Sequence, residues 1–234
     1  MRVLVACEFS GIVRDAFSAL GHDAWSCDLL QSERPGQHIQ GDVTEELRKR
    51  WDLVVAHPPC TYLSYAGTAH WNSPGRDKLR EAAMEFFMLC YNANSPRVCV
   101  ENPFGLPHVR FRPANQIVNP WDFGEPIQKR TCLWLRGLPL LWRRDTLFGN
   151  DRTPQPAPPP EPIYVGTRIA TGKPKKRYDT DCAGRKMQRR WHRTKAISRA
   201  TDEERRHERS RFFVSIANAM AEQWGGKVEA LCST

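Results

Sequence analysis

The sequence predicts an α/β fold, built as a doubly wound and mostly parallel sheet, and three observations favour it. Short apolar runs alternate with amphipathic segments along about the first 140 residues, which is the order expected when helices cover both faces of a parallel sheet. The chain has 234 residues, enough for one full domain of this class with an appendage. Hydrophobic residues make up 40% of it and charged residues 26%, so it can bury a sizeable core.

The N-terminal elements carry the clearest patterns. Arg2–Cys7 (RVLVAC) is a short apolar run typical of a fully buried strand. After a turn, Ile12–Leu20 carries apolar residues at helical spacing, and Gly21 ends this predicted helix. His22–Cys27 is predicted as the second strand, and the acid Asp28 follows it.

The middle of the chain continues the alternation. Gly41–Val43 is predicted as a brief third element, and Thr44 as the start of a short helix. Asp52–Ala56 (DLVVA) has the pattern of a buried strand, and Arg76–Tyr91 that of an amphipathic helix with one apolar side. Arg97–Val100 is the next buried strand, which completes the element order of a doubly wound sheet.

The pattern changes after Thr131–Leu135, the last strand predicted for this sheet. Residues 154–162 contain six prolines, typical of a stiff connector with polyproline II character. Thr201–Ala221 again has helical spacing, with Thr201 or Asp202 as its cap. We therefore divide the chain into a main domain, a proline-rich connector with a basic segment, and a C-terminal helix returning to the main domain, over residues 1–148, 149–200 and 201–234.

The formal net charge of +9 is concentrated in one segment. Residues 164–199 hold twelve basic and two acidic side chains, so the rest of the chain is close to neutral. A near-neutral body with one strongly basic segment predicts a polyanionic partner, and we expect contact with nucleic acid. A solvated loop that only keeps the protein soluble is the alternative. The side chains expected to contact nucleic acid, with the tryptophan stacking on bases, are Arg168, Lys175, Lys176, Arg177, Arg189, Arg190, Trp191 and Arg193.

Cysteine and histidine spacing argues against a metal site. The eight cysteines are scattered without a C-x-x-C pair, and the histidines show no ligand spacing, so we predict no metal and no disulfide framework. No apolar run reaches the ~18 residues of a membrane span, and the N-terminus turns polar too soon for a secretory signal. We expect a cytoplasmic protein with no membrane partner, and a monomer is favoured.

Polar or flexible groups stand where four of the predicted strands end. They are the glycine turn at Gly11, the acid Asp28, the Pro-Pro-Cys turn at Cys60, and the pair Glu101 and Asn102. In a doubly wound sheet, ligands bind at the carboxyl ends of the strands. The sequence therefore predicts one functional site that combines these groups.

Cys60 is the candidate nucleophile of this site. Two prolines, Pro58 and Pro59, fix the backbone before it, and a thiolate is a strong carbon nucleophile. If a pyrimidine lies between Cys60 and Glu101, sulfur can add to ring carbon C6 while a carboxyl group donates to N3. Ring carbon C5 can then attack an electrophilic methyl group, lose its proton, and allow the sulfur to leave. Methyl transfer to an exocyclic amine needs no thiol, so Cys60 disfavours it.

These residues resemble those of the cytosine-C5 DNA methyltransferases, in a compact form similar to members carried by phages and prophages. The resemblance covers about residues 1–140 and the C-terminal helix, and its most specific motif is Pro58-Pro59-Cys60. It implies a Rossmann-like methyltransferase fold, S-adenosyl-L-methionine as cofactor, double-stranded DNA as partner with a flipped cytosine as substrate, and a bacterial or phage-infected host cell. The catalytic residues that it implies are Cys60, Glu101, Asn102 and Arg130.

The resemblance also implies residues that hold the cofactor and the base. Phe9-Ser10-Gly11 resembles the glycine motif in which the aromatic residue contacts adenine. Asp28 matches the acid that binds the ribose hydroxyls, and Asp42 resembles the acid that accepts from the adenine amino group. Gln128-Lys129-Arg130 resembles a motif that orients the base and contacts phosphate. The full cofactor set is Phe9, Ser10, Gly11, Asp28, Asp42, His57, Pro58 and Asn218, and Pro59 and Gln128 join the substrate-binding residues.

The sequence departs from the family pattern at several positions. His57 and Ala217 stand where the family usually has glycine, Thr61 replaces a glutamine, and Pro103 replaces a small apolar residue. His57 and nearby basic residues could accept carboxy-S-adenosyl-L-methionine, so transfer of a carboxymethyl group is the alternative activity. A catalytically inactive homologue that only binds DNA, and an enzyme acting on RNA or free nucleotides, also stay open.

Overall fold

The computed structural model describes residues 1–65, 73–125, 129–142, 179–180, 186–187 and 211–226. These residues fall into two compact units. The first takes its described residues from 1–118, 130–141 and 212–226, and the second from 119–129 and 142–211. The second unit holds the 3-10 helix η2 (Pro120–Phe123) and an antiparallel strand pair, β8 (Asp179–Thr180) and β9 (Lys186–Met187).

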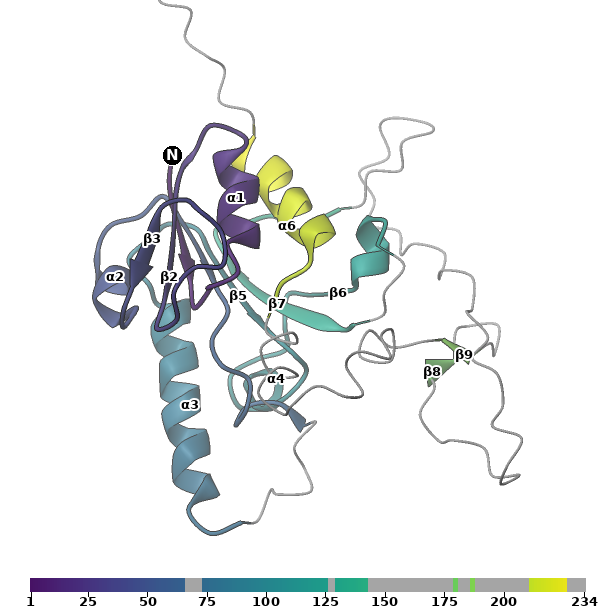
Figure 1. The fold of residues 1–234 in the computed structure, drawn as a ribbon. Helices are drawn as coiled ribbons and strands as arrows, with labels where there is room; N and C mark the ends of the chain where they lie inside the picture. The colour runs from purple at the N-terminus through teal and green to yellow at the C-terminus, as the bar shows by residue number, and fades with distance from the viewer. Residues whose placement is uncertain (66–72, 126–128, 143–178, 181–185, 188–210, 227–234) are drawn as a thin grey trace, which may run out of the picture. The chain divides into compact units, whose positions relative to one another are not determined.

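A seven-stranded sheet lies at the centre of the first unit, in the order β3-β2-β1-β4-β5-β7-β6 (Figure 1). Neighbouring strands from β3 to β5 are parallel, whereas β7 runs antiparallel to both β5 and β6. This confirms the predicted α/β fold with a doubly wound, mostly parallel sheet. The strands are β1 (Arg2–Ala6), β2 (Asp23–Asp28), β3 (His38–Gln40), β4 (Leu53–Ala56), β5 (Val98–Asn102), β6 (Gln116–Val118) and β7 (Thr131–Arg136).

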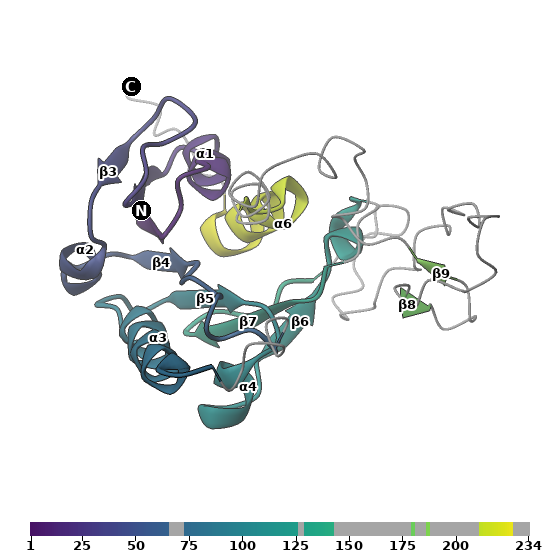
Figure 2. The same cartoon turned by 60° about the horizontal axis from the view of Figure 1, so that its bottom comes forward.

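Helices cover both faces of this sheet (Figure 2). Helix α1 packs against α6 on one face, and α2, α3 and α4 lie on the other, where α3 contacts both of its neighbours. A π-helical turn, η4 (Ala221–Gly225), continues α6. The helices are α1 (Ile12–Ser18), α2 (Thr44–Arg48), α3 (Arg76–Tyr91), α4 (Leu106–Arg110) and α6 (Val214–Met220).

The strands are apolar along their whole length because helices bury both faces of the sheet. Side chains alternate along a strand, so Leu4 of β1 joins the core beneath α3, together with Phe87 and Trp134. Val3 and Val5 are also fully buried, although they point to the opposite face. A strand covered on both sides reads as a continuous apolar run, as the sequence of β1 does.

Two predicted boundaries near the strand ends are wrong by a few residues. The third strand lies at His38–Gln40 rather than 41–43, because Asp42 belongs to a turn in which its Oδ1 accepts the N–H of Thr44 at 2.8 Å. Glu101 and Asn102 are the last residues of β5 instead of following it, since pairing with β7 extends the strand to Asn102.

The C-terminal helix begins at Val214 in the structure, later than the predicted residue 201. Residues 201–210 of that prediction lie outside the described residues. Phe213 has extended backbone (φ −100°, ψ 129°), and both Phe212 and Phe213 are buried. The apolar spacing from Phe213 to Met220 predicts one helical face, but Phe213 itself is extended and packs from the segment before the helix. Within the described residues, no helix is long and apolar enough to cross a membrane.

Candidate active site

The carboxyl ends of β1, β2, β4 and β5 lie at one edge of the sheet, because these strands are parallel. Chain order reverses between β1 and β4, and ligands of doubly wound sheets bind at such a reversal. The turn at Gly11 follows β1, Asp28 ends β2, Cys60 follows β4, and Glu101 and Asn102 end β5. All four groups predicted from the sequence therefore meet at this edge.

Cys60 occupies a turn four residues after the end of β4, and its thiol is exposed to solvent. Pro58 is buried and anchors the turn, whereas Pro59 is exposed. The carbonyl oxygen of Cys60 accepts the N–H groups of Leu63 at 3.1 Å and Ser64 at 2.9 Å, which closes the turn behind the thiol. An exposed sulfur on a backbone fixed from both sides can meet a ligand without rearrangement of the chain.

The turn after Cys60 is fastened to the segment after β5. Ser64 forms an antiparallel bridge with Gly105, and the N–H of Leu106 donates to the carbonyl of Leu63 at 2.8 Å. A Cβ atom at Gly105 would collide with that carbonyl, so only glycine allows this close approach. The turn that carries Cys60 and the segment that follows Glu101 and Asn102 are thus held together by backbone contacts.

The buried side chain of Asn102 connects the end of β5 to the segment that follows β4. Its Nδ2 donates to the carbonyl oxygen of Pro58 at 2.8 Å, and the residue is 1% exposed. Its Oδ1 is buried and accepts no hydrogen bond from the described residues. Because Pro58 stands two residues before Cys60, this bond positions the Cys60 turn relative to β5.

Glu101 faces His57 across the same pair of strand ends. Oε2 of Glu101 lies 3.5 Å from Nδ1 of His57, and the two side chains are 13% and 10% exposed. Nε2 of His57 is buried, and no described residue gives it a hydrogen bond. Glu101 is therefore a largely buried carboxyl group in contact with an imidazole ring, at the same edge of the sheet as Cys60.

A buried acid that was not among the predicted site residues, Glu8, organises the glycine turn. Its Oε1 accepts the N–H of Val13 at 2.7 Å, its Oε2 that of Arg14 at 3.2 Å, and Ser10 Oγ donates to it at 3.2 Å. Burial raises the pKa of Glu8, while His57 and these donors oppose the rise. The turn itself needs glycine, because Gly11 has a left-handed φ of 70°.

Asp28 and Asp42 lie on neighbouring turns. Asp28 is partly buried; burial raises its pKa, and the N–H of Leu30, which donates to Oδ1 at 2.9 Å, lowers it. The N–H of Gly41 donates to the backbone carbonyl of Asp28 at 2.8 Å, which brings the Asp42 turn beside the end of β2. Asp42 is exposed, and its hydrogen bonds with Thr44 lower its pKa.

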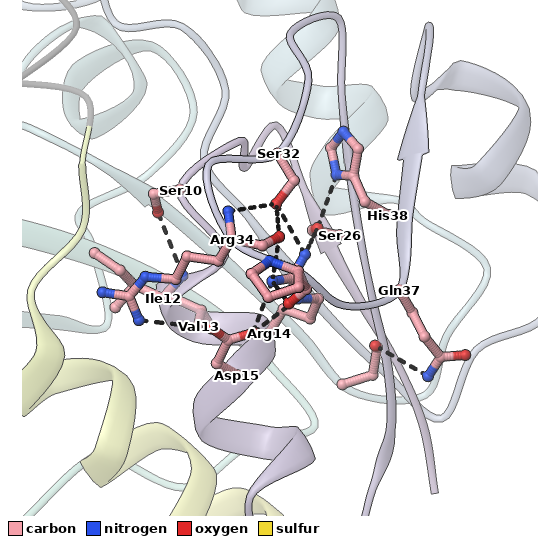
Figure 3. A network of polar contacts seen from close by, with 12 residues as sticks. Ser10, Ile12, Val13, Arg14, Asp15, Ser26, Ser32, Arg34, Gln37 and His38 are labelled. Atoms are coloured by element: carbon pink, nitrogen blue, oxygen red, sulfur yellow. Dashed lines mark hydrogen bonds and ion pairs between the residues drawn. The ribbon is translucent and has the colours of Figure 1, made fainter.

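Arg14 is a second residue that the sequence patterns did not indicate, and it braces the loop after Asp28 (Figure 3). Its guanidinium is 1% exposed and pairs with Asp15 at 2.7 Å. It also donates to Ser32 Oγ at 3.0 Å and to the carbonyl of Pro35 at 3.1 Å. Ser26 Oγ links it at 3.2 Å to the end of β2. The only sequence signal that Arg14 holds this loop was the presence of an arginine in an otherwise apolar helical face.

The remaining predicted cofactor residues have mixed exposure. Phe9 and Ser10 are 5% and 2% exposed, so neither presents an open side-chain surface. Asn218 is exposed on α6, which packs on α1 and so lies in the layer of the glycine turn.

Arg130 reaches the end of β5 because β7 is antiparallel to it. Asn102 pairs with Cys132, which places the start of β7 beside the last residue of β5. The guanidinium carbon of Arg130 lies 5.8 Å from the ring centroid of Phe104, which is 39% exposed. The other predicted substrate contacts lie outside the described residues: Gln128, Arg168, Lys175, Lys176, Arg177, Arg189, Arg190, Trp191 and Arg193.

No cluster of three or more His, Cys, Asp or Glu side chains in the described part of the chain is arranged to hold a metal ion.

Comparison with known proteins finds likeness in structure alone. No protein-family model matches the sequence, and no curated protein does. One similar structure is that of a DNA modification methyltransferase encoded within an E. coli prophage, with 15% identity, a TM-score of 0.38, and 58% of this chain and 46% of that one covered. Another is the 16S rRNA methylase RmtB, with 14% identity, a TM-score of 0.27, and coverage of 57% and 54%. The chain thus spans about half the length of each.

Proposed function

We propose that this protein is a DNA cytosine-C5 methyltransferase that uses S-adenosyl-L-methionine and acts on a flipped cytosine. One observation carries the proposal. The exposed thiol of Cys60 stands at a strand end that a buried Asn102–Pro58 hydrogen bond of 2.8 Å joins to the strand ending in Glu101 and Asn102. Addition to a pyrimidine ring requires a nucleophile and a carboxyl group in one site, and Cys60 and Glu101 lie at the same edge of the sheet.

The charges at the strand ends fit a sulfonium cofactor. The carboxyl groups of Glu8, Asp28 and Glu101 all lie near this edge, and each is partly or fully buried. A cation bound among them gains electrostatic stabilisation, because buried charges are poorly screened. S-adenosyl-L-methionine carries such a cation and supplies the methyl group as an electrophile. The residues proposed to hold it are Phe9, Ser10, Gly11, Asp28, Asp42, His57, Pro58 and Asn218.

The chain's own residues then perform addition and elimination. Cys60 Sγ, as the thiolate, forms a bond to C6 of the cytosine, while the carboxyl group of Glu101 gives a hydrogen bond or a proton to N3. This makes C5 nucleophilic, and C5 would take the methyl group as the bond from that carbon to the sulfonium sulfur breaks, which leaves a neutral thioether. A base then removes the C5 proton, the bond from sulfur to C6 breaks, and N3 returns its proton to Glu101. Asn102 keeps the two strand ends aligned throughout.

The proposed substrate is duplex DNA with one base turned out of the stack. The basic segment at 164–199 would supply phosphate contacts, which make binding sensitive to salt. Unstacking a base costs a few kcal/mol, which contacts at the strand ends would offset. Arg130, which lies over the exposed ring of Phe104, would contact the nucleic acid next to Glu101.

Carboxymethyl transfer is the second candidate, and one observation favours it. Nε2 of His57 is buried without a hydrogen-bond partner among the described residues, and it could donate to the carboxylate of carboxy-S-adenosyl-L-methionine. The carboxyl groups of Glu8, Asp28 and Glu101 oppose an additional negative charge at the same edge. We therefore place methyl transfer first.

The test is mass spectrometry of nucleosides from DNA of a host that expresses the protein. We expect 5-methylcytosine with the wild type and none with Cys60→Ala, which should still bind S-adenosyl-L-methionine. Cys90→Ala, which removes a buried thiol from α3, is the matched control and should keep activity. A product heavier than 5-methylcytosine by the mass of CO2 would establish the second candidate. DNA binding without any modified base would establish the inactive homologue, and a fully active Cys60→Ala would refute the role of Cys60 as nucleophile.

Competition among duplex DNA, RNA and deoxycytidine monophosphate identifies the substrate.

A further inference from the structure

His57 lies where three strands meet. It directly follows β4, and its backbone N–H donates to the carbonyl of Ala6 at the end of β1, at 2.9 Å. Its Nδ1 lies 3.5 Å from Glu101 Oε2 on β5. The residue thus connects the strand that leads to the glycine turn with the strand that carries the candidate acid.

The imidazole ring is held in one orientation. Its centroid lies 4.6 Å from the ring centroid of Phe212, with the planes tilted by 49°. Phe212 is itself 7% exposed and stands just before α6. A ring that is 10% exposed and packs against an aromatic side chain has little rotamer freedom, and its Nδ1 is directed at Glu101.

Carboxyl groups from three elements face this ring. Glu101 on β5 is in contact with it, while Glu8 in the turn after β1 and Asp28 at the end of β2 interact with it at longer range. The charge of His57 lowers the pKa of both Glu8 and Asp28, against the rise that burial causes. Among these acids, Glu101 is the one within reach of Nδ1.

We propose that His57 is the positioning residue of Glu101: Nδ1–H donates to Oε2, so that the other carboxyl oxygen is presented to N3 of the target cytosine. This inference rests on the proposed function. A glutamate at a strand end has three rotatable side-chain bonds, and one anchored oxygen restricts all of them. A misplacement of the acting oxygen weakens the activation of C6, and with it the attack by Cys60.

The proposal is tested with His57→Asn, His57→Gln and His57→Ala. The amide nitrogen of asparagine can take the place of Nδ1, whereas that of glutamine takes the place of Nε2. The readout is the single-turnover rate on a duplex oligonucleotide, with S-adenosyl-L-methionine affinity measured beside it. We expect His57→Ala and His57→Gln to lose roughly 10- to 100-fold in rate, below the full effect of a general acid, and His57→Asn to recover much of it. His22→Asn, which removes another largely buried imidazole, should keep the rate.

A second measurement separates positioning from a merely structural role. The base 5-azacytosine is more electrophilic at C6 and depends less on help at N3, so the defect of His57→Ala should shrink on an oligonucleotide that contains it. In a Glu101→Gln background, His57→Ala should cause little further loss, because the two residues act as one unit. An equal defect on both bases, or additive losses in the double variant, would overturn the inference. If instead the wild type forms no product and no adduct with 5-azacytosine, the proposed function itself fails.

Discussion

The buried amide of Asn102 offers the sharpest test of how the site is held together. In Asn102→Ala, the carbonyl of Pro58 loses its 2.8 Å hydrogen bond and stays buried without a partner. An orphaned buried polar group costs about 1–3 kcal/mol. The substitution also removes Oδ1, which is buried and unpartnered among the described residues, so part of that cost is returned. We expect a net loss of about 1–2 kcal/mol in the free energy of unfolding.

When both are expressed as free energies, the effect of Asn102→Ala on the reaction rate should exceed its effect on the free energy of unfolding. Without the bond, the Pro58–Cys60 turn can shift against β5, and a displacement of about 1 Å at a reacting group can cost 100-fold in rate. Urea unfolding gives the stability change, and a thermal scan should show a midpoint lower by roughly 2–8 °C. Single-turnover kinetics on a cytosine-containing duplex, measured well below that midpoint, gives the rate.

Asn94→Ala is the matched control, because Asn94 makes the same kind of bond in an exposed position. Its Nδ2 donates to the carbonyl of Arg48 at 3.0 Å, where water can replace it. We expect Asn94→Ala to cost at most about 1 kcal/mol and to leave the rate unchanged. If Asn102→Ala were no more destabilising than Asn94→Ala and just as active, the idea that this amide aligns the nucleophile with β5 would be wrong.

Two further perturbations probe the cofactor side of the edge. Arg14→Met should destabilise the fold by about 1–3 kcal/mol in urea unfolding, because Ser32 and the carbonyl of Pro35 lose a buried donor, and Arg14→Lys should cost less. Asp15, which is 36% exposed, keeps its ion pair with Arg34 at 3.5 Å. Equal stability of Arg14→Met and wild type would contradict this. Burial raises the pKa of Glu8, so the native state holds its proton to higher pH than the unfolded state does, and this contribution to stability is lost as pH rises through the interval between the two pKa values. Glu8→Gln should therefore gain stability relative to wild type as pH rises above the ordinary glutamate pKa of about 4.3, measured by urea unfolding at a series of pH values, and a constant difference would count against a buried, pKa-shifted carboxyl group.

The sequence was enough to place most elements of the sheet, because strong local patterns specify them. Arg76–Tyr91 has the predicted bounds, since Gly75 precedes a long amphipathic run that packs on the sheet. Cys60, Asp28 and Glu101 could be placed at one edge because parallel strands share a direction. Short elements such as α4 (Leu106–Arg110) were not predicted, because five residues give too little periodicity.

The contacts that organise the site could not be predicted, since each depends on residues far apart in the chain. His57 and Glu101 are 44 residues apart, as are Pro58 and Asn102. Local patterns carry no information on which side chains two parallel strands bring together at their ends. The bonds of Arg14 likewise form only after the loop beyond β2 folds back over α1.

The reversed direction of β7 explains why a basic residue accompanies the two candidate acids of β5. If β7 ran parallel to β5, the residues before it would emerge at the opposite edge of the sheet. Because it is antiparallel, with Asn102 paired to Cys132, the segment that enters β7 arrives beside the end of β5. Arg130 then lies over Phe104, two residues beyond Asn102. A fully parallel sheet of the same sequence would separate the proposed phosphate contact from Glu101, so the function proposed for this edge requires the mixed sheet.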